Sequence, residues 1–320
     1  MTPLVLRLRD EGGQSIVLIA LGLTVIIGLC ALVVDVGSWY REQRHVQVAA
    51  DAAALAAAQD LPNIGTATAT AASYASNNAS GLNSWTPTFP STSPCSAGGC
   101  IDVRLSKPVP GYFSRLFDVD SVTVHAHARA LVGVPASLKN VAPIAIKSTS
   151  VCLTGSTGCF GVTKRVSFNE SSLSSSTFGL VNLDCQGASS SSCSGSGTGA
   201  SQLVSWIANG YNGLLDVNKW YAAVTGEKIG PIRDSLGAAA GHVLLIPVYD
   251  TTSGLSFHVV GWAAFVLNSG GVIEWKNDTP GCRPNCKVLE GKFVEYIAHG
   301  VVSSTGGGTG FGVRVVALVQ

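Results

Sequence analysis

The feature that most constrains this 320-residue chain is an uncharged apolar run near its start. Residues Ile16–Val34 read IVLIALGLTVIIGLCALVV, nineteen residues without a charged side chain. As a helix they would span roughly 28 Å, the thickness of a bilayer's hydrocarbon core. A cleaved signal peptide is the alternative, but Asp35 follows directly and no small-residue cleavage site lies at the boundary. We therefore predict a retained membrane-spanning helix over about residues 16–34.

The charge composition excludes one broad class of function. Charged residues make up 12% of the chain, against about 25% in a typical soluble domain. Twenty basic and nineteen acidic residues leave a formal charge of +1. Binding to phosphate backbones needs clustered Lys and Arg, so we expect no nucleic-acid partner.

The cysteines predict on which side of the membrane the chain lies. Cys30 falls inside the apolar run, and the other eight fall into four pairs of near neighbours: Cys95 and Cys100, Cys152 and Cys159, Cys185 and Cys193, Cys282 and Cys286. Eight cysteines allow 105 connectivities, and local disulfides are the simplest, because such short loops bring two Cα atoms within about 6 Å. No C-x-x-C zinc knuckle is present. Disulfides persist in oxidising compartments, so we expect a cytoplasmic N-terminus and an extracytoplasmic remainder.

The helix is expected to continue well beyond the membrane run. Residues 35–60 contain no Pro, and residues 49–58 read AADAAALAAA. Since Ala is the best helix former, Gln14 to about Gln59 could form one rod of roughly 70 Å.

Small residues recur every four positions along this predicted rod, which permits close helix packing. They are Ala20, Thr24 and Gly28 in the membrane run and Ala49, Ala53 and Ala57 beyond it. The rod should pack against its own domain or against another copy. Asp35 and Asp51 could lie on a solvated helix face, or could form a polar pair at a helix–helix contact that sets its register.

The rest of the chain predicts an α+β fold. Residues 61–100 carry no charge and suggest a linker, with a short helix near residues 67–76. Residues 101–320 should form a mostly antiparallel, β-rich extracytoplasmic domain with disulfides and a Ser/Gly-rich insertion at about residues 171–201. We predict helices at 201–209 and 214–224. Strands are predicted at 101–105, 122–134, 242–249, 257–267, 292–297 and 311–319.

Candidate chemical sites are sparse. His125 and His127 would lie on one side of a strand, but no acidic residue is near them in sequence to complete a metal site. The GGGTG run at 306–310 lacks the Lys-Ser/Thr of a phosphate-binding loop. We assign no catalytic, cofactor-binding or metal residues.

Three stretches give the N-terminal part a family resemblance: RDEGGQSIV at 9–17, VVDVGSWY at 33–40 and VQVAADAAALAAA at 46–58. Together they resemble the TadE/TadG-like proteins of the Flp (tight-adherence) pilus assembly system. A weaker likeness continues in LLIPVYD at 244–250, VVGWAAFVL at 259–267 and GKFVEY at 291–296.

The resemblance implies a non-catalytic, single-pass protein of the bacterial inner membrane with a role in pilus assembly or secretion. Its partners would be the lipid bilayer and other pilus-assembly or pilin-like membrane helices, or a second copy of the chain. The alternative is a ligand-binding or hydrolytic extracytoplasmic module that shares the same anchor.

Two motifs of related proteins are missing here. No Asp begins the Asp-x-Ser-x-Ser pattern of a von Willebrand A metal site. Cleavage after Gly13 would place Leu18 where pilin precursors carry Glu, so processing at Gly13 is not expected.

Overall fold

The computed structural model describes residues 14–93, 95, 98–150, 153, 160–168, 178–191, 198–224, 229–268, 274–275, 287–302 and 310–319. The chain forms two compact units, Met1–Ala130 with Leu318–Gln320, and Leu131–Ala317. Each unit is described by itself.

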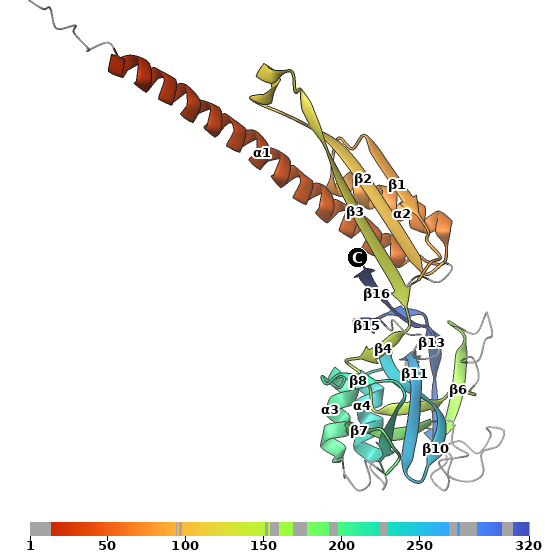
Figure 1. The fold of residues 1–320 in the computed structure, drawn as a ribbon. Coiled ribbons are helices and arrows are strands. Elements are labelled where there is room, and N and C mark those ends of the chain that lie inside the picture. Colours follow the sequence, from red (N-terminus) through yellow and green to blue (C-terminus); the bar gives the residue numbers. More distant parts are fainter. Residues whose placement is uncertain are drawn as a thin grey trace, which may run out of the picture. The chain divides into compact units, whose positions relative to one another are not determined.

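The first unit is built on one long helix, α1 (Gln14–Ala58), of 45 residues (Figure 1). Its length corresponds to roughly 68 Å. The expected rod is confirmed to within one residue at its end. Its N-terminal part is the apolar run, and its C-terminal part is the Ala-rich segment.

A second helix, α2 (Ile64–Asn78), packs chiefly on α1. The Asn63 side chain caps it by accepting a hydrogen bond of 3.2 Å from the backbone N–H of Thr66. The face toward α1 consists of small residues at four-residue spacing, Ala67, Ala71 and Ala75, all buried. Short side chains let the two helix backbones approach closely.

A sheet in the order β1-β2-β3 completes the first unit. Its strands are β1 (Ser84–Thr88), β2 (Cys100–Pro110) and β3 (Ser121–Gly133), of which β1 and β2 are antiparallel. The turn between β2 and β3 contains a short 3-10 helix, η2 (Ser114–Phe117). The short helix expected near residues 67–76 is present as α2, but residues 61–100 also contain β1. Because α2 packs on α1 and β1 packs on β2, this stretch is not the linker that we expected.

The second unit contains the larger sheet, in the order β10-β5-β7-β9-β11-β13-β12, with β6 paired to β13. Because β10 also pairs with β11, five of these strands close into a ring. The pairing of β10 with β5 is parallel, and the other pairings of this sheet are antiparallel. The strands are β5 (Ile144–Lys147), β6 (Thr163–Phe168), β7 (Phe178–Gly187), β9 (Lys219–Ala223), β10 (Val243–Ser253), β11 (Ser256–Leu267), β12 (Glu274–Trp275) and β13 (Lys287–Val294).

The structure also contains several smaller elements. A three-stranded sheet has the order β15-β4-β8, and β14 pairs with β16 in parallel. Helices α3 and α4 pack on each other. Their bounds are β4 (Pro135–Leu138), β8 (Leu215–Asp216), β14 (Tyr296–Ile297), β15 (Gly300–Val302), β16 (Val313–Val319), α3 (Ala200–Asn209) and α4 (Ile229–Ala238).

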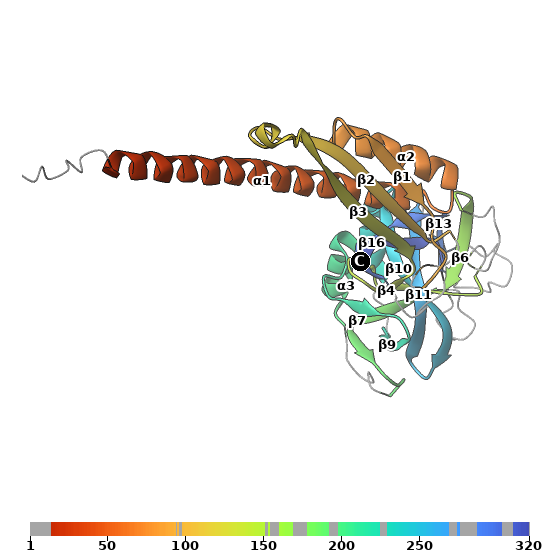
Figure 2. The same ribbon diagram turned by 45° about the horizontal axis from the view of Figure 1, so that its top comes forward.

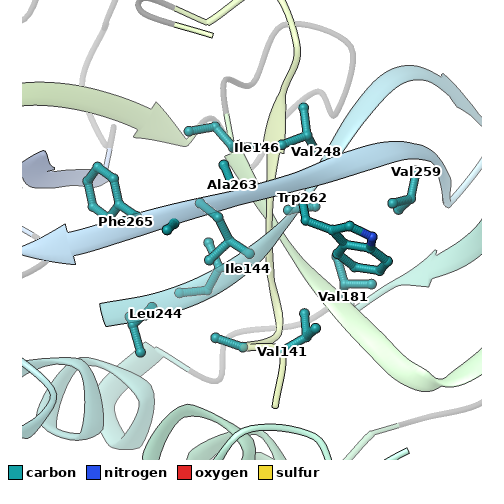
Figure 3. Close-up of a cluster of buried hydrophobic side chains, with 14 of the residues drawn as sticks. Val141, Ile144, Ile146, Val181, Leu244, Val248, Val259, Trp262, Ala263 and Phe265 are labelled. Carbon is teal, nitrogen blue, oxygen red and sulfur yellow. The ribbon is translucent and has the colours of Figure 1, made fainter. Parts of the chain in front are cut away.

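The core of the second unit is apolar and aromatic. Figure 3 shows Trp262 of β11 beside Val181 and Val259, with Phe265 further along the same strand. All four are buried. The predicted α+β class, with a long apolar N-terminal helix and mostly antiparallel sheets, is therefore confirmed.

Two local predictions in this unit are wrong. Residues 214–224 form β8 and β9 rather than a helix, because Trp220 and Tyr221 pair with His258 and Phe257 of β11. Their apolar spacing suits a helix, but tertiary pairing decides. Within the expected insertion at 171–201, residues 178–187 form β7, which lies between β5 and β9 in the sheet.

Candidate functional site

The apolar segment of α1, residues 16–34, is exposed in the structure. One helix in the described part of the chain is long and apolar enough to cross a membrane, and it is this one. All residues of the segment are exposed except Ala31, which is half-buried. The segment thus has almost no protein neighbours to cover its side chains.

The small residues of this segment are uncovered in the described part of the chain. Ala20, Thr24 and Gly28 are exposed, and a Cβ added to Gly28 would meet nothing within 4 Å. The Thr24 Oγ1 donates to the Ala20 carbonyl at 2.9 Å, so its hydroxyl is satisfied within α1. Their predicted role in helix packing stays a prediction.

Asp35 follows the apolar segment and fastens the β2–β3 turn to α1. Its side chain is only 2% exposed. The carboxylate accepts hydrogen bonds from three consecutive backbone N–H groups, those of Tyr112 (2.9 Å), Phe113 (3.0 Å) and Ser114 (2.6 Å). The first N–H groups of a helical turn lack hydrogen-bond acceptors within that turn. The Asp35 carboxylate, on another element, is the acceptor for them. Asp35 therefore does not lie on a solvated face, and its partner is the turn of a hairpin rather than a second long helix.

Further contacts fix the direction in which β2 runs along α1. The Lys107 Nζ lies 2.5 Å from the Glu42 Oε1. A Cβ built on Gly111 would lie 3.4 Å from the Trp39 ring. From residue 107 to residue 114, successive residues of the chain contact earlier and earlier residues of α1, from residue 42 to residue 35. The turn therefore points toward the apolar segment, and both ribbon views show it beside the first half of α1 (Figures 1 and 2).

The turn itself exposes large apolar side chains. We call residues Tyr112–Phe117 the hairpin tip. Within it, Leu116 is 86% exposed and Phe117 78% exposed, and Tyr112 and Phe113 are also exposed. Sequence reasoning missed the significance of this turn. The available signal was a strongly apolar sequence, YFSRLF, in a turn between two strands, where polar residues are usual.

The Ala-rich part of α1 is buried within its own unit. Ala49, Ala53 and Ala57 are fully buried, and this part of α1 contacts α2 and β2. Of the two expectations, packing against its own domain is therefore the one observed for this segment.

Asp51 also contacts β3 through its neighbour Gln47. The Gln47 Nε2 donates to the Asp51 Oδ1 and to the His127 carbonyl, each at 2.8 Å. The Gln47 Oε1 accepts from the His127 backbone N–H at 3.4 Å. The carboxylate thus orients an amide that ties α1 to the sheet.

A buried carboxylate organises the charges of the first unit's sheet. Asp102 is 1% exposed, and its Oδ2 lies 2.8 Å from the His127 Nε2 and from the Arg129 Nη2. Arg104 is an ion-pair partner at 3.5 Å. Burial raises the pKa of the Asp102 carboxyl, but the hydrogen bonds from His127 and Arg129 and the nearby charges outweigh it and leave the pKa below its ordinary value. His127 is thus a partner of Asp102, which accounts for one of the two histidines considered as metal ligands.

The cysteines are only partly within the described residues. Cys95 and Cys100 form a disulfide, with an S–S distance of 2.05 Å and a Cα–Cα distance of 5.6 Å. Cys185 is also disulfide-bonded, and Cys30 is free and exposed. Outside the described residues lie Cys152, Cys159, Cys193, Cys282 and Cys286.

The second unit has an open cavity of about 390 Å³. Its lining includes the side chains of Asn140, Trp206, Ser235 and His242. Within the described ranges, no three His, Cys, Asp or Glu side chains gather in a way that could hold a metal ion.

These features define a class: a folded, β-rich protein carried on a long helix whose first part is apolar and uncovered. Comparison with protein families shows which families the N-terminal part is similar to. Residues 13–60 match the Tad family, Flp pilus-assembly TadE/G-like. Residues 37–130 match the Tad_C family, Tad-like Flp pilus-assembly. The resemblance seen in the sequence is therefore confirmed: residues 13–60 are similar to the TadE/G-like family, and residues 37–130 are similar to the Tad_C family. Neither a search of curated proteins nor one of solved structures found a match.

Proposed function

We propose that this chain is a non-catalytic, single-pass inner-membrane protein that acts as a structural or assembly component of a Flp-type pilus or a related secretion apparatus. The observation that carries the proposal is the coincidence of two findings. The TadE/G-like match begins at residue 13, and the same helix exposes the apolar segment, residues 16–34, with only Ala31 half-buried.

The disulfides support the orientation that we propose for the chain. Cys95–Cys100 lies in the first unit and Cys185 in the second. Both units would then face an oxidising compartment, with the N-terminus in the cytoplasm. Protease added to intact spheroplasts should digest both units. Protection until the membrane is dissolved would refute this orientation.

The assembly contact we propose lies in the membrane. Because Ala49, Ala53 and Ala57 are already buried by their own unit, they have no free face for a partner. The stripe of Ala20, Thr24 and Gly28 is still uncovered. Small residues at this spacing let membrane helices approach closely, so we assign to this stripe the contact with other pilus-assembly or pilin-like helices, or with a second copy.

A matched pair of glycine variants tests this contact. Gly28→Leu adds a bulky side chain to the stripe. Gly22→Leu makes the same change on the opposite face of the same helix, and a Cβ at either position meets nothing within the chain. In the native bacterium, Gly28→Leu should abolish crosslinking to partner helices and reduce pilus assembly, whereas Gly22→Leu should do neither. Equal behaviour of the two variants, at equal expression, would refute the assigned face.

The alternative is a ligand-binding or hydrolytic module that shares the anchor. The cavity lined by Trp206 and His242 is the observation that favours it. Deletion of the gene distinguishes between the two proposed functions. Loss of pili, restored by the wild-type gene, supports the assembly role, and normal piliation favours the alternative.

A further inference from the structure

We propose that the hairpin tip, residues Tyr112–Phe117, is a second membrane contact that inserts into the outer interface of the bilayer beside α1. The inference rests on the proposed membrane anchor, because α1 sets the depth of the tip. It adds a lipid-binding surface in the folded part of the chain, eighty residues after the anchor.

The position of the tip along α1 supports this placement. Lys107 lies against Glu42, Gly111 lies near Trp39, and residues 112–114 bind Asp35. Continuing the same direction brings residues 115–117 beside the turn of α1 that precedes Asp35. Ala31, the half-buried residue of the apolar segment, lies on that turn and on the same face as Asp35, and α1 does contact η2. Four residues of helix rise about 6 Å, so the tip reaches the last turn of the span.

The side chains of the tip suit the membrane interface. Tyr and Trp concentrate at the headgroup level, which suits Tyr112, and Leu116 and Phe117 supply strongly exposed apolar side chains that lipid can cover. Arg115 directly precedes Leu116 and can reach lipid phosphates. Asp118 and Asp120 follow the tip on the return toward β3, so the lipid contact we propose is apolar rather than driven by net positive charge.

The hydrogen bonds of Asp35 are also explained by this location. A carboxylate at the edge of the hydrocarbon is costly unless polar partners surround it. The tip provides three N–H donors to Asp35, and its apolar side chains face away from that contact into the surroundings. A single contact thus satisfies the carboxylate and holds the apolar tip at the level of the membrane surface.

A lipid surface is favoured over a protein partner because the tip continues the exposed surface of the apolar segment. Both belong to the same unit, and Asp35 joins them directly. Any bilayer that surrounds residues 16–34 must therefore meet residues 115–117.

Site-specific photocrosslinking tests the proposal with the full chain. The photoreactive residue p-benzoylphenylalanine is placed in separate variants at Phe117, at Val25 in the apolar segment, and at Tyr74, an exposed aromatic position on α2. The purified protein is reconstituted into vesicles of phosphatidylethanolamine and phosphatidylglycerol and irradiated. We expect phospholipid adducts at positions 117 and 25 in comparable yield, and only background at position 74.

The outcomes separate the tip from the anchor. Adducts at 25 without adducts at 117 overturn the inference and leave the anchor intact. No adducts at 25 overturn the anchor itself. Crosslinking of position 117 to a polypeptide in native membranes, in place of lipid, would show that a protein occupies this surface and would also overturn the proposal. Amide hydrogen exchange at residues 112–114 verifies that the variant at 117 retains the contact with Asp35.

Discussion

The buried Ala stripe of α1 gives the sharpest test of how the first unit is held together. Ala53 is fully buried, at the centre of a helix segment that packs on α2 and β2. Ala71 on α2 is equally buried. Neither residue leaves room for a longer side chain without moving a helix backbone, since small residues are what bring the two helices close together.

Ala53→Leu adds three carbon atoms at this position. Overpacking of a well-packed contact costs about 1–3 kcal/mol. Leu is nearly as good a helix former as Ala, so helix propensity does not offset that cost. Because each 1.4 kcal/mol is a factor of ten in an equilibrium constant, the opening equilibrium of this helix pair should rise by roughly 5- to 150-fold.

Amide hydrogen exchange of the full chain in detergent measures that opening directly, for peptides that cover residues 46–58 and 64–78. The matched control is Ala69→Leu, the same substitution at an exposed position of α2, which should exchange like the wild type. Ala71→Leu should behave like Ala53→Leu. Indistinguishable exchange in Ala53→Leu and Ala69→Leu would refute close packing of the two helices.

Three further predictions concern the contacts that surround this helix pair. Asp35→Ala should speed amide exchange at residues 112–114, because three N–H groups lose their acceptor, and Asp35→Asn should have a smaller effect; unchanged exchange would contradict the capping role. Because the folded-state pKa of Asp102 lies below its ordinary value of 3.8, its charge stabilises the unit above that pH, and this stabilisation is lost as pH falls through the lowered pKa. Acid unfolding curves of Asp102→Asn should therefore be flatter than those of the wild type, and identical curves would exclude the contribution. Replacing Cys95 and Cys100 by Ser should lower the free energy of unfolding of the first unit by about 2 kcal/mol relative to the disulfide-bonded wild type, measured by urea unfolding; the reduced wild type should match the variant, and equal stability of the variant and the disulfide-bonded protein would contradict the prediction.

The long helix was predictable because two independent sequence signals agree on it. The apolar run and the Ala-rich run are both strong helix signals, and no Pro lies between them. The strands β2 and β3 were predictable for the same reason, since alternation places Ile101, Val103 and Leu105 on buried positions. Local patterns of this strength hold in any tertiary context.

The elements that were missed depend on contacts between distant residues. Strand β7 lies in a Ser-rich stretch, but it gains partners on both sides, with Val181 opposite Ala223 and Ile144 opposite Leu180. Residues 214–224 have apolar spacing that suits either a helix or two short strands. Pairing with β11 decides in favour of strands. Neither partner strand can be deduced from the local sequence.

The hairpin tip shows why a site of this kind escapes a motif search. No residue of the tip belongs to a known catalytic or ligand-binding pattern, and Asp35 alone resembles any other carboxylate at the end of an apolar helix. The two become informative only together, when the Asp35 carboxylate is seen to accept from Tyr112, Phe113 and Ser114. The sequence then makes physical sense at both places. An acidic residue is tolerated at the end of the span because the turn supplies hydrogen-bond donors to its carboxylate. In our proposal, an apolar turn is tolerated between two strands because the contact with Asp35 holds its side chains against lipid rather than water.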